Sequence, residues 1–328
     1  MKLLPRISTL FLVLYLIYTP KASAQTGHLN CTGDILLSTQ AEVDAFDCDS
    51  IAGSLTVNGP DITNLDGLQG LIQVGGNLTI SPGMLANLQG LRNLRGVGGS
   101  LEITRQSALR NLDGLESLVS IGQDLILSNL TNVSNVRGLI GLKEIPGELS
   151  IVNISRLFSF RGLDSLRRVG GDFEANAGMV NTNGVEKLEE IGGRLTIRSQ
   201  NLTTLSGFAN LKRIGEGIVL EGNFALLTLD GFQKLETLGG SFDLRTNPNL
   251  RTLDALPELR EVGGNLNLPF RNLGNLEKLQ KVGGVLRLSS IRQVSQNPPT
   301  FCSFSRFPRF LKGKLRFPPT SLSSGRAS

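Results

Sequence analysis

The stretch LDGLQGLIQVGGNLTI at residues 65–80 decides the fold, because its pattern returns along most of the chain. The pattern is L-x-G-L-x-x-L-x-x-[VI]-G-G-x-L-x-[IL], and it is clear again in LQGLRNLRGVGGSLEI at 88–103 and LDALPELREVGGNLNL at 253–268. Eleven such units at a nearly constant period predict a solenoid, since one unit cannot bury its apolar side alone. The second residue of the glycine step falls at positions 53, 76, 99, 123, 147, 171, 193, 216, 240, 264 and 284.

Each unit contains a strand and a corner, and we expect it to form one coil. Its tail, x-L-x-I, alternates with period two, which is typical of a strand. The glycine pair before the tail predicts a bend with no room for a Cβ atom. The L-x-x-L-x-x-[VI] segment is too short for a stable α-helix, so we expect extended or 3-10-like chain there. The sequence therefore predicts an all-β solenoid of about eleven coils over residues 51–295.

Charge columns indicate how the coils stack. The two residues before each [VI]-G-G step would lie beside their equivalents in neighbouring coils, and their signs alternate. Opposite charges at adjacent sheet positions attract by roughly 0.2–1 kcal/mol per pair, so the alternation predicts parallel stacking in register. One column runs Arg167, Glu189, Lys212, Glu236, Arg260, and its neighbour runs Glu144, Arg168, Glu190, Arg213, Thr237, Glu261, Lys281.

Composition excludes several functional classes. The 328 residues include one His, three Cys and no Trp, which leaves no His pair for a metal site and argues against a Ser-His-Asp site. The formal net charge is +5, but residues 1–24 hold +3 and residues 296–328 hold +6, so residues 25–295 hold −4. A nucleic-acid-binding protein needs a basic stripe on its folded body, so we expect no nucleic-acid partner.

The N-terminus predicts export. Residues 1–24 have a basic start with Lys2 and Arg6, a short apolar run and an A-x-A site, which is the organisation of a cleaved signal peptide. We therefore expect a mature chain from Gln25 that is extracellular or at the cell surface and contacts a membrane only through an anchor absent from this sequence. Its expected N-glycosylation sequons are Asn30, Asn77, Asn129, Asn132, Asn153 and Asn201.

Cys31, the run LLSTQAEVDAFDCDSIAGSLTV at 36–57 and the repeats that follow resemble the receptor L-domain family. These are ligand-binding right-handed β-solenoids of insulin- and EGF-receptor ectodomains, and the repeat also occurs in fungal GPI-anchored cell-wall organisation proteins. The resemblance covers residues 31 to about 295 and implies a right-handed parallel β-solenoid, a cap over residues 25–50 and a binding role, with no catalytic residue. Leucine-rich repeats rank second, because the Asn that usually ends their strands is not kept.

The three cysteines lie near the two ends of the predicted solenoid. A Cys31–Cys48 bridge would tie down the N-terminal cap and stabilise it by about 3 kcal/mol; the alternative is two free thiols. Cys302 would pair with a later Cys in a C-terminal cap, and none follows. Residues 296–328 are rich in Pro and Phe and contain no acid, which fits either a basic disordered tail or a gene model that has lost its frame.

The outward residues of one strand row of a solenoid form a continuous face that usually binds ligands. Asp124, Glu148 and Asp172 would stack there on successive coils, and of these three acids Arg194 could offset only Asp172. We hypothesise that this acidic column binds Ca²⁺ or a basic patch of a ligand; the alternative is a solvated acidic face. The candidate face consists of Glu102, Asp124, Glu148, Asp172, Glu174, Arg194, Asp243, Asn265 and Asn267.

The sequence thus predicts a non-enzymatic secreted or surface glycoprotein that binds an extracellular protein or polysaccharide through its solenoid face. One alternative is a structural component of a cell wall or coat, GPI-anchored in its complete form. The other is a polysaccharide-acting β-helix enzyme. The enzyme interpretation is disfavoured because Trp is absent and both Tyr lie in residues 1–24, which leaves no aromatic platform on the sheet face for a sugar ring to stack on.

Overall fold

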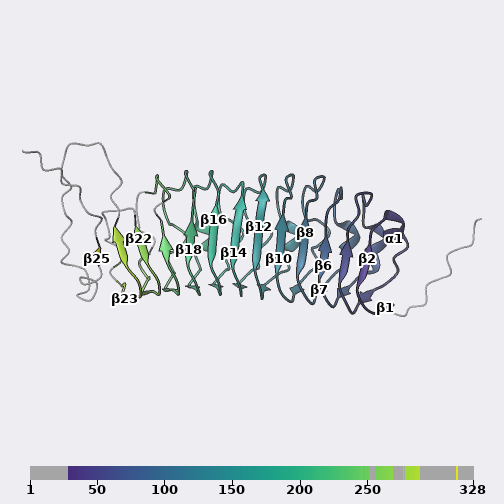
Figure 1. Cartoon of the computed structure of the whole chain (residues 1–328), viewed down its shortest axis with the longest axis horizontal. Helices are drawn as coiled ribbons and strands as arrows, with labels where there is room; N and C mark the ends of the chain where they lie inside the picture. Colours follow the sequence, from purple (N-terminus) through teal and green to yellow (C-terminus); the bar gives the residue numbers. More distant parts are fainter. Residues whose placement is uncertain are drawn as a thin grey trace, which may run out of the picture.

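The chain folds into an elongated stack of coils (Figure 1). The computed structural model describes residues 29–244, 246–250, 256–268, 276 and 278–288, together with the strand at 315–316. The predicted signal segment, Cys302 and most of the predicted tail lie outside these residues. No helix in the described part of the chain is long and apolar enough to cross a membrane.

Within the described residues, one side of the stack is a sheet of thirteen parallel strands, which we call the wide sheet. Strands β4 to β24 are the x-L-x-I tails of the eleven predicted units, and each pairs with its equivalent in the next unit, as Leu125 does with Leu149. The predicted all-β parallel solenoid is therefore confirmed. The strands are β2 Ile35–Leu37, β4 Leu55–Val57, β6 Leu78–Ile80, β8 Leu101–Thr104, β10 Leu125–Ser128, β12 Leu149–Ile154, β14 Phe173–Ala177, β16 Leu195–Arg198, β18 Ile218–Leu220, β20 Phe242–Asp243, β22 Leu266–Leu268, β24 Leu286–Leu288 and, from the predicted tail, β25 Leu315–Arg316.

A second side carries two-residue strands just before each glycine step, and we call it the narrow side. In the part of the chain that the structure describes, this side is divided into sheets of five and seven strands, and the break falls at Pro146. In the coils before and after it, the equivalent residue is a glycine whose N–H bonds to the preceding coil: Gly122 N donates to Val97 O at 2.9 Å, and Gly170 N donates to Ile145 O at 2.8 Å. Proline has no N–H to donate, so this bond is missing at Pro146. The strands are β1 Asn30–Cys31, β3 Ser50–Ile51, β5 Gln73–Val74, β7 Gly96–Val97, β9 Ser120–Ile121, then β11 Glu144–Ile145, β13 Arg168–Val169, β15 Glu190–Ile191, β17 Arg213–Ile214, β19 Thr237–Leu238, β21 Glu261–Val262 and β23 Lys281–Val282.

The narrow side brings the alternating charges together as predicted. Its strands pair Glu144 with Arg168, and Arg168 with Glu190. Arg168 Nε lies 3.8 Å from Glu190 Oε2. In the neighbouring column Lys212 Nζ donates to Glu189 Oε2 at 2.8 Å. Parallel stacking in register is therefore confirmed by the strand pairing and by the ion pairs.

The glycine pairs mark a corner where successive coils approach closely. A Cβ atom on Gly98 would lie 2.0 Å from Gly75 O, and one on Gly122 would lie 1.8 Å from Gly98 O. A side chain at that separation would overlap the backbone of the preceding coil. The spacing between coils, rather than an unusual backbone angle, therefore selects glycine at these positions.

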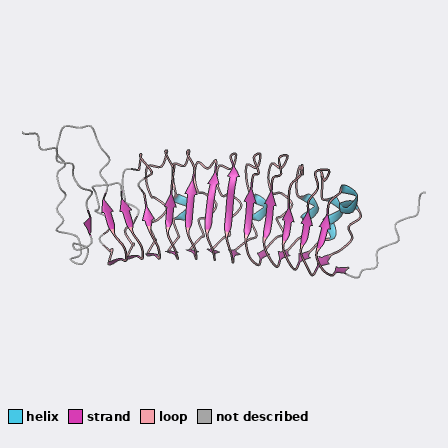
Figure 2. Ribbon diagram, viewed as in Figure 1, coloured by secondary structure: helices cyan, strands magenta, loops and turns pink. Residues whose placement is uncertain are grey.

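Apolar side chains fill the interior of the coils. Leu65, Leu68 and Leu71 of the first period-three segment are all buried, and several such segments form the expected 3-10 turns, drawn as helices in Figure 2. Five phenylalanines stack through the central coils, mostly edge to face, with neighbouring ring centroids 5.2 to 6.4 Å apart. The turns are η1 Asp66–Gly70, η2 Gln89–Leu91, η3 Arg137–Leu139 and η4 Ser206–Phe208, and the phenylalanines are Phe160, Phe173, Phe208, Phe232 and Phe242.

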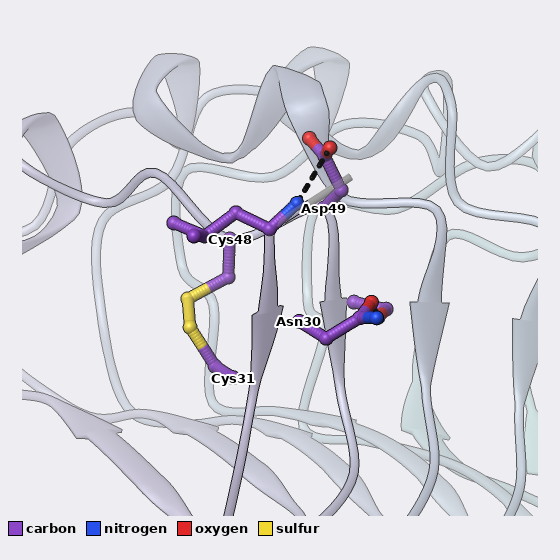
Figure 3. Close-up of a disulfide and its surroundings, with 6 residues drawn as sticks. Asn30, Cys31, Cys48 and Asp49 are labelled. Atoms are coloured by element: carbon purple, nitrogen blue, oxygen red, sulfur yellow. Dashed lines mark hydrogen bonds between the residues drawn. A yellow bond between two sulfur atoms is a disulfide. The ribbon is translucent and has the colours of Figure 1, made fainter. Parts of the chain in front are cut away.

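A small cap closes the N-terminal end of the stack. Its helix α1, Gln40–Asp44, begins with a capping box, in which Glu42 N donates to the Thr39 hydroxyl and Thr39 N donates to the Glu42 carboxylate at 3.0 Å. Cys31 and Cys48 form the predicted disulfide, with Cα atoms 5.9 Å apart (Figure 3). The bridge ties β1 to the chain that enters β3, so the cap is fastened to the first coils.

Candidate functional site

The predicted face lies on the outward side of the wide sheet, in two columns. The second column is within the strands, where Glu102 pairs with Ile126, and Ser150 pairs with both Ile126 and Glu174. These side chains are half-buried between their neighbours. Because Ile126 and Ser150 separate Glu102 from Glu174, the acids of this column do not adjoin one another.

The first column lies one residue before each strand, and most of its side chains bond to the backbone of the next coil. Asp124 Oδ1 accepts from Glu148 N at 2.8 Å, and Asp172 Oδ1 accepts from Arg194 N at 2.7 Å. We call this series the side-chain ladder. In the other members of the ladder, a side-chain oxygen likewise accepts from the backbone N–H of the next coil. These bonds join Asp34 Oδ1 with Ser54 N at 2.7 Å, Ser54 Oγ with Asn77 N at 3.1 Å, Asn77 Oδ1 with Ser100 N at 2.8 Å, Ser100 Oγ with Asp124 N at 3.2 Å, Ser241 Oγ with Asn265 N at 2.9 Å and Asn265 Oδ1 with Val285 N at 2.8 Å.

Asp124, Glu148 and Asp172 occupy adjacent coils as predicted, but two of them have a structural role in the ladder. Burial raises the pKa of Glu148, a hydrogen bond with the Ser150 side chain opposes this rise, and repulsion from Asp172, Asp124 and Glu174 adds to it. The described residues contain no group of three or more His, Cys, Asp or Glu placed to hold a metal ion. The calcium hypothesis therefore stays a prediction, and the raised pKa of Glu148 is the electrostatic feature of the column.

The basic residues of the face do not pair with the three acids of this column. Arg194 was expected to neutralise Asp172, but its guanidinium pairs with Glu216 at 3.3 Å, while only its backbone N–H reaches the Asp172 carboxylate. Arg198 Nη1 lies 3.1 Å from Glu174 Oε1. That expectation for Arg194 is therefore wrong, because its long side chain extends toward the following coil.

The C-terminal candidates of the face are held by their neighbours. Asn265 belongs to the side-chain ladder, and Asn267 Nδ2 donates to Asp243 Oδ2 at 3.1 Å. Asn267 is only 5% exposed, although it was predicted as part of an accessible face. A ligand on this face would therefore meet Asp243 and Asn265 rather than Asn267.

The structure reveals a groove of about 550 Å³ that the sequence did not indicate. It lies at the C-terminal ends of β12, β14, β16 and β18, beside a bulge in β12 where the register shifts between Val152 and Ile154. Its lining combines amide side chains, Arg198 with Glu221, and Phe224, which is 50% exposed. It is lined by Asn153, Ile154, Ser155, Asn176, Ala177, Gly178, Arg198, Ser199, Gln200, Asn201, Glu221, Gly222 and Phe224.

Three predicted sequons gather near one corner of the coils. Asn129 and Asn153 take the left-handed conformation, with φ of 56° and 58°, and Asn153 Nδ2 donates to Asn129 Oδ1 at 3.1 Å. Asn132 is half-buried, and its amide donates to Ser107 O at 2.7 Å. Asn30, Asn77 and Asn201 are exposed. Glycosylation of all six stays a prediction.

Buried asparagines at the strand ends were missed from the sequence. Asn223 and Asn247 are fully buried in successive coils, and their amides bond to each other at 3.3 Å and to Ile197 O and Leu220 O. The signal is L-x-x-N-x-x-L, at 220–226 and 244–250. The statement that the strand-end Asn of leucine-rich repeats is not kept is therefore wrong for these two coils.

These features define a repeat protein of the parallel β-solenoid class. No family model and no curated protein sequence matches the chain. Among solved structures the chain is similar to a leucine-rich repeat protein from Bacteroides ovatus, with 10% sequence identity, coverage of 82% of this chain and 94% of that one, and a TM-score of 0.21. The class therefore rests on the coil geometry described above, and membership of the receptor L-domain family stays an expectation.

Proposed function

We propose that this protein is secreted or displayed at the cell surface, carries N-linked glycans and binds a protein or glycan ligand through the outward side of the wide sheet, without catalysis. Stacked repeats present continuous faces that serve as extended binding surfaces. The Cys31–Cys48 disulfide supports an oxidising compartment. The signal-like residues 1–24 and the six sequons point the same way.

The observation that carries the binding face is the acidic centre of the wide sheet. Asp124, Glu148 and Asp172 lie on adjacent coils, and burial and mutual repulsion raise the pKa of Glu148. Arg194, the basic residue of this column, directs its charge to Glu216. A cationic group placed against the column would relieve the repulsion, so a ligand with a basic patch fits this face best.

A charge-neutralised variant tests the face. Asp124→Asn and Asp172→Asn keep the acceptor oxygen of the ladder, as Asn77 and Asn265 do in the same column, and Glu148→Gln completes the change. We expect the triple variant to bind a short oligolysine peptide roughly tenfold more weakly than the parent protein at low salt, measured by calorimetry. High salt should reduce the difference.

A second triple variant controls for net charge. Asp47→Asn, Asp61→Asn and Glu144→Gln remove the same charge from exposed positions outside the wide sheet. This variant should bind the peptide nearly as well as the parent. Equal weakening in both triple variants would mean that overall charge attracts the peptide, and would contradict a dedicated face.

Export has its own test. The full chain is expressed in a eukaryotic secretory host, and we expect it in the medium with Gln25 as its first residue. Treatment with peptide N-glycosidase should increase its electrophoretic mobility, because the sequons are predicted to carry glycans. Retention in the cytosol with residues 1–24 attached would overturn this part of the proposal.

A further inference from the structure

The groove at the strand ends offers polar groups that the chain itself does not use. Within the part of the chain that the structure describes, Asn176 and Gln200 make no hydrogen bond through their side chains, and both are exposed. A carboxamide both donates and accepts hydrogen bonds. A sugar hydroxyl does the same, so these amides match a hydroxyl-rich ligand.

A fixed guanidinium lies among these amides. Arg198 donates from Nη1 to Glu174 Oε1 and from Nε to Glu221 Oε2, both at 3.1 Å. Two carboxylates from the neighbouring coils thus hold the guanidinium in place and offset its charge. The groove therefore presents planar polar groups without an excess of positive charge, which favours a neutral ligand over an anionic one.

One end of the groove carries an aromatic ring. Phe224 is 50% exposed, and the amide of Asn249 donates to its carbonyl oxygen at 2.7 Å. Small residues such as Ala177, Gly178 and Gly222 also line the groove, and they offer little apolar surface to a peptide side chain. An exposed ring beside polar groups suits the apolar face of a sugar ring.

The direction of the groove indicates a chain-like ligand. Its lining comes from four successive coils, so it crosses the strands along the axis of the stack. Equivalent positions recur there about every 4.8 Å, which is close to the length of one sugar unit in a linear glycan. We propose that this groove binds a linear, uncharged oligosaccharide, with Asn176, Gln200 and Arg198 contacting its hydroxyl groups and Phe224 stacking on one ring.

The groove lies outside the acidic column on which the proposed function rests, so the two proposals can fail separately. Binding of linear hexasaccharides of glucose, mannose and N-acetylglucosamine is measured by calorimetry, with a polygalacturonate hexamer as the charged comparison. Every protein tested is made in the periplasm of a bacterial host that adds no N-linked glycans, so Asn153, Ser155 and Asn201 of the groove keep their side chains.

We expect at least one uncharged hexasaccharide to bind more tightly than the galacturonate. The double variant Asn176→Ala/Gln200→Ala should weaken that binding roughly tenfold, the effect of losing two hydrogen bonds, and Phe224→Ala should weaken it several-fold. Gln123→Ala, which removes an exposed amide at a distant corner, should leave binding unchanged.

Three results would overturn the proposal. They are no binding of any uncharged hexasaccharide, tighter binding of the galacturonate, or unchanged affinity in the double variant. Binding of a neutral Gly/Ser-rich peptide, lost in the same double variant while the sugars do not bind, would assign the groove to an extended polypeptide instead.

Discussion

The narrow side and the wide sheet are built by the same stacking, yet they treat charge in opposite ways. On the narrow side, signs alternate from coil to coil, and Arg168 pairs with Glu190. On the wide sheet, Asp124, Glu148 and Asp172 repeat one sign on adjacent coils, and burial, with a smaller contribution from repulsion by the neighbouring acids, raises the pKa of Glu148. In-register stacking places equivalent residues of adjacent coils side by side. Charges of alternating sign therefore stabilise the stack, and charges of the same sign destabilise it.

This difference bears on where the proposed ligand would bind. On the narrow side, alternating charges form ion pairs within the chain, as Arg168 does with Glu190. The wide sheet uses the oxygens of its short polar side chains to bond the backbone of the next coil, as Asp124 does with Glu148 N. The negative charge of those side chains is not required for that bond, because Asn77 and Asn265 make it without charge.

The largest expected effect comes from the corner between the two sides. Gly122→Val would place a Cβ atom 1.8 Å from Gly98 O, so two coils would have to separate on both sides at once. We expect the variant to lose about 3 kcal/mol or more of unfolding free energy, measured by urea denaturation followed by circular dichroism. The adjacent Gln123→Ala, at an exposed position, should be nearly neutral; a comparable loss there would mean that the corner is generally intolerant.

The next effect distinguishes hydrogen bonding from charge on the wide sheet. Asp124→Ala removes the acceptor of Glu148 N and should lower the unfolding free energy by about 1–2 kcal/mol. Asp124→Asn keeps the acceptor and removes one repelling charge, so its stability should equal or exceed that of the parent. If both variants lose the same amount, the charge of Asp124 rather than its ladder bond stabilises the sheet.

A smaller effect is expected on the narrow side. Glu190→Lys would put three cations in register, with Arg168 and Arg213 on either side. Because these side chains are about half exposed, the loss should be about 0.5 kcal/mol at low salt and less at high salt. Glu190→Gln should fall between the parent and the lysine variant, and a salt-independent loss would contradict an electrostatic cause.

Much of the fold could be predicted because a repeat tests each inference many times. The glycine steps, the x-L-x-I tails and the alternating charges recur at nearly fixed spacing, and each corresponds to a corner, a strand or an ion pair. The break at Pro146 was not predicted, although one missing N–H in a repeated ladder explains it. The buried amides of Asn223 and Asn247 were missed because they occupy only two coils.

The candidate site was less predictable, because a column position does not determine what a side chain contacts. The positions of Asp124, Glu148 and Asp172 followed from the period. The ladder bonds depend on side-chain length. An aspartate is short enough to accept from the backbone N–H of the next coil, whereas the guanidinium of Arg194 extends past the Asp172 carboxylate. Arg194 extends to Glu216 for that reason. The groove depends on a bulge in β12 and on small residues in successive coils, which no repeat pattern expresses.

The smallest expected effect is the pH dependence of the two sides, and its sign should differ between them. The pKa of Glu148 is raised above its ordinary 4.5, mainly by burial. Its contribution to stability is therefore present below pH 4.5 and is lost as pH rises through its folded pKa. The hydrogen bond and charge of Lys212 hold the pKa of Glu189 below 4.5, so its contribution is present above pH 4.5 and is lost as pH falls through its folded pKa.

Glu148→Gln and Glu189→Gln should therefore shift the stability profile in opposite directions. Relative to the parent, Glu148→Gln should gain stability as pH rises from 4.5 toward neutral, because the parent loses its protonated carboxyl over that range. Glu189→Gln should be less stable than the parent at neutral pH and approach it as the solution is acidified below 4.5. Urea denaturation across this pH range measures both. Shifts of the same sign would mean that neither burial nor repulsion raises the pKa of Glu148, and would remove the electrostatic reason for a basic ligand.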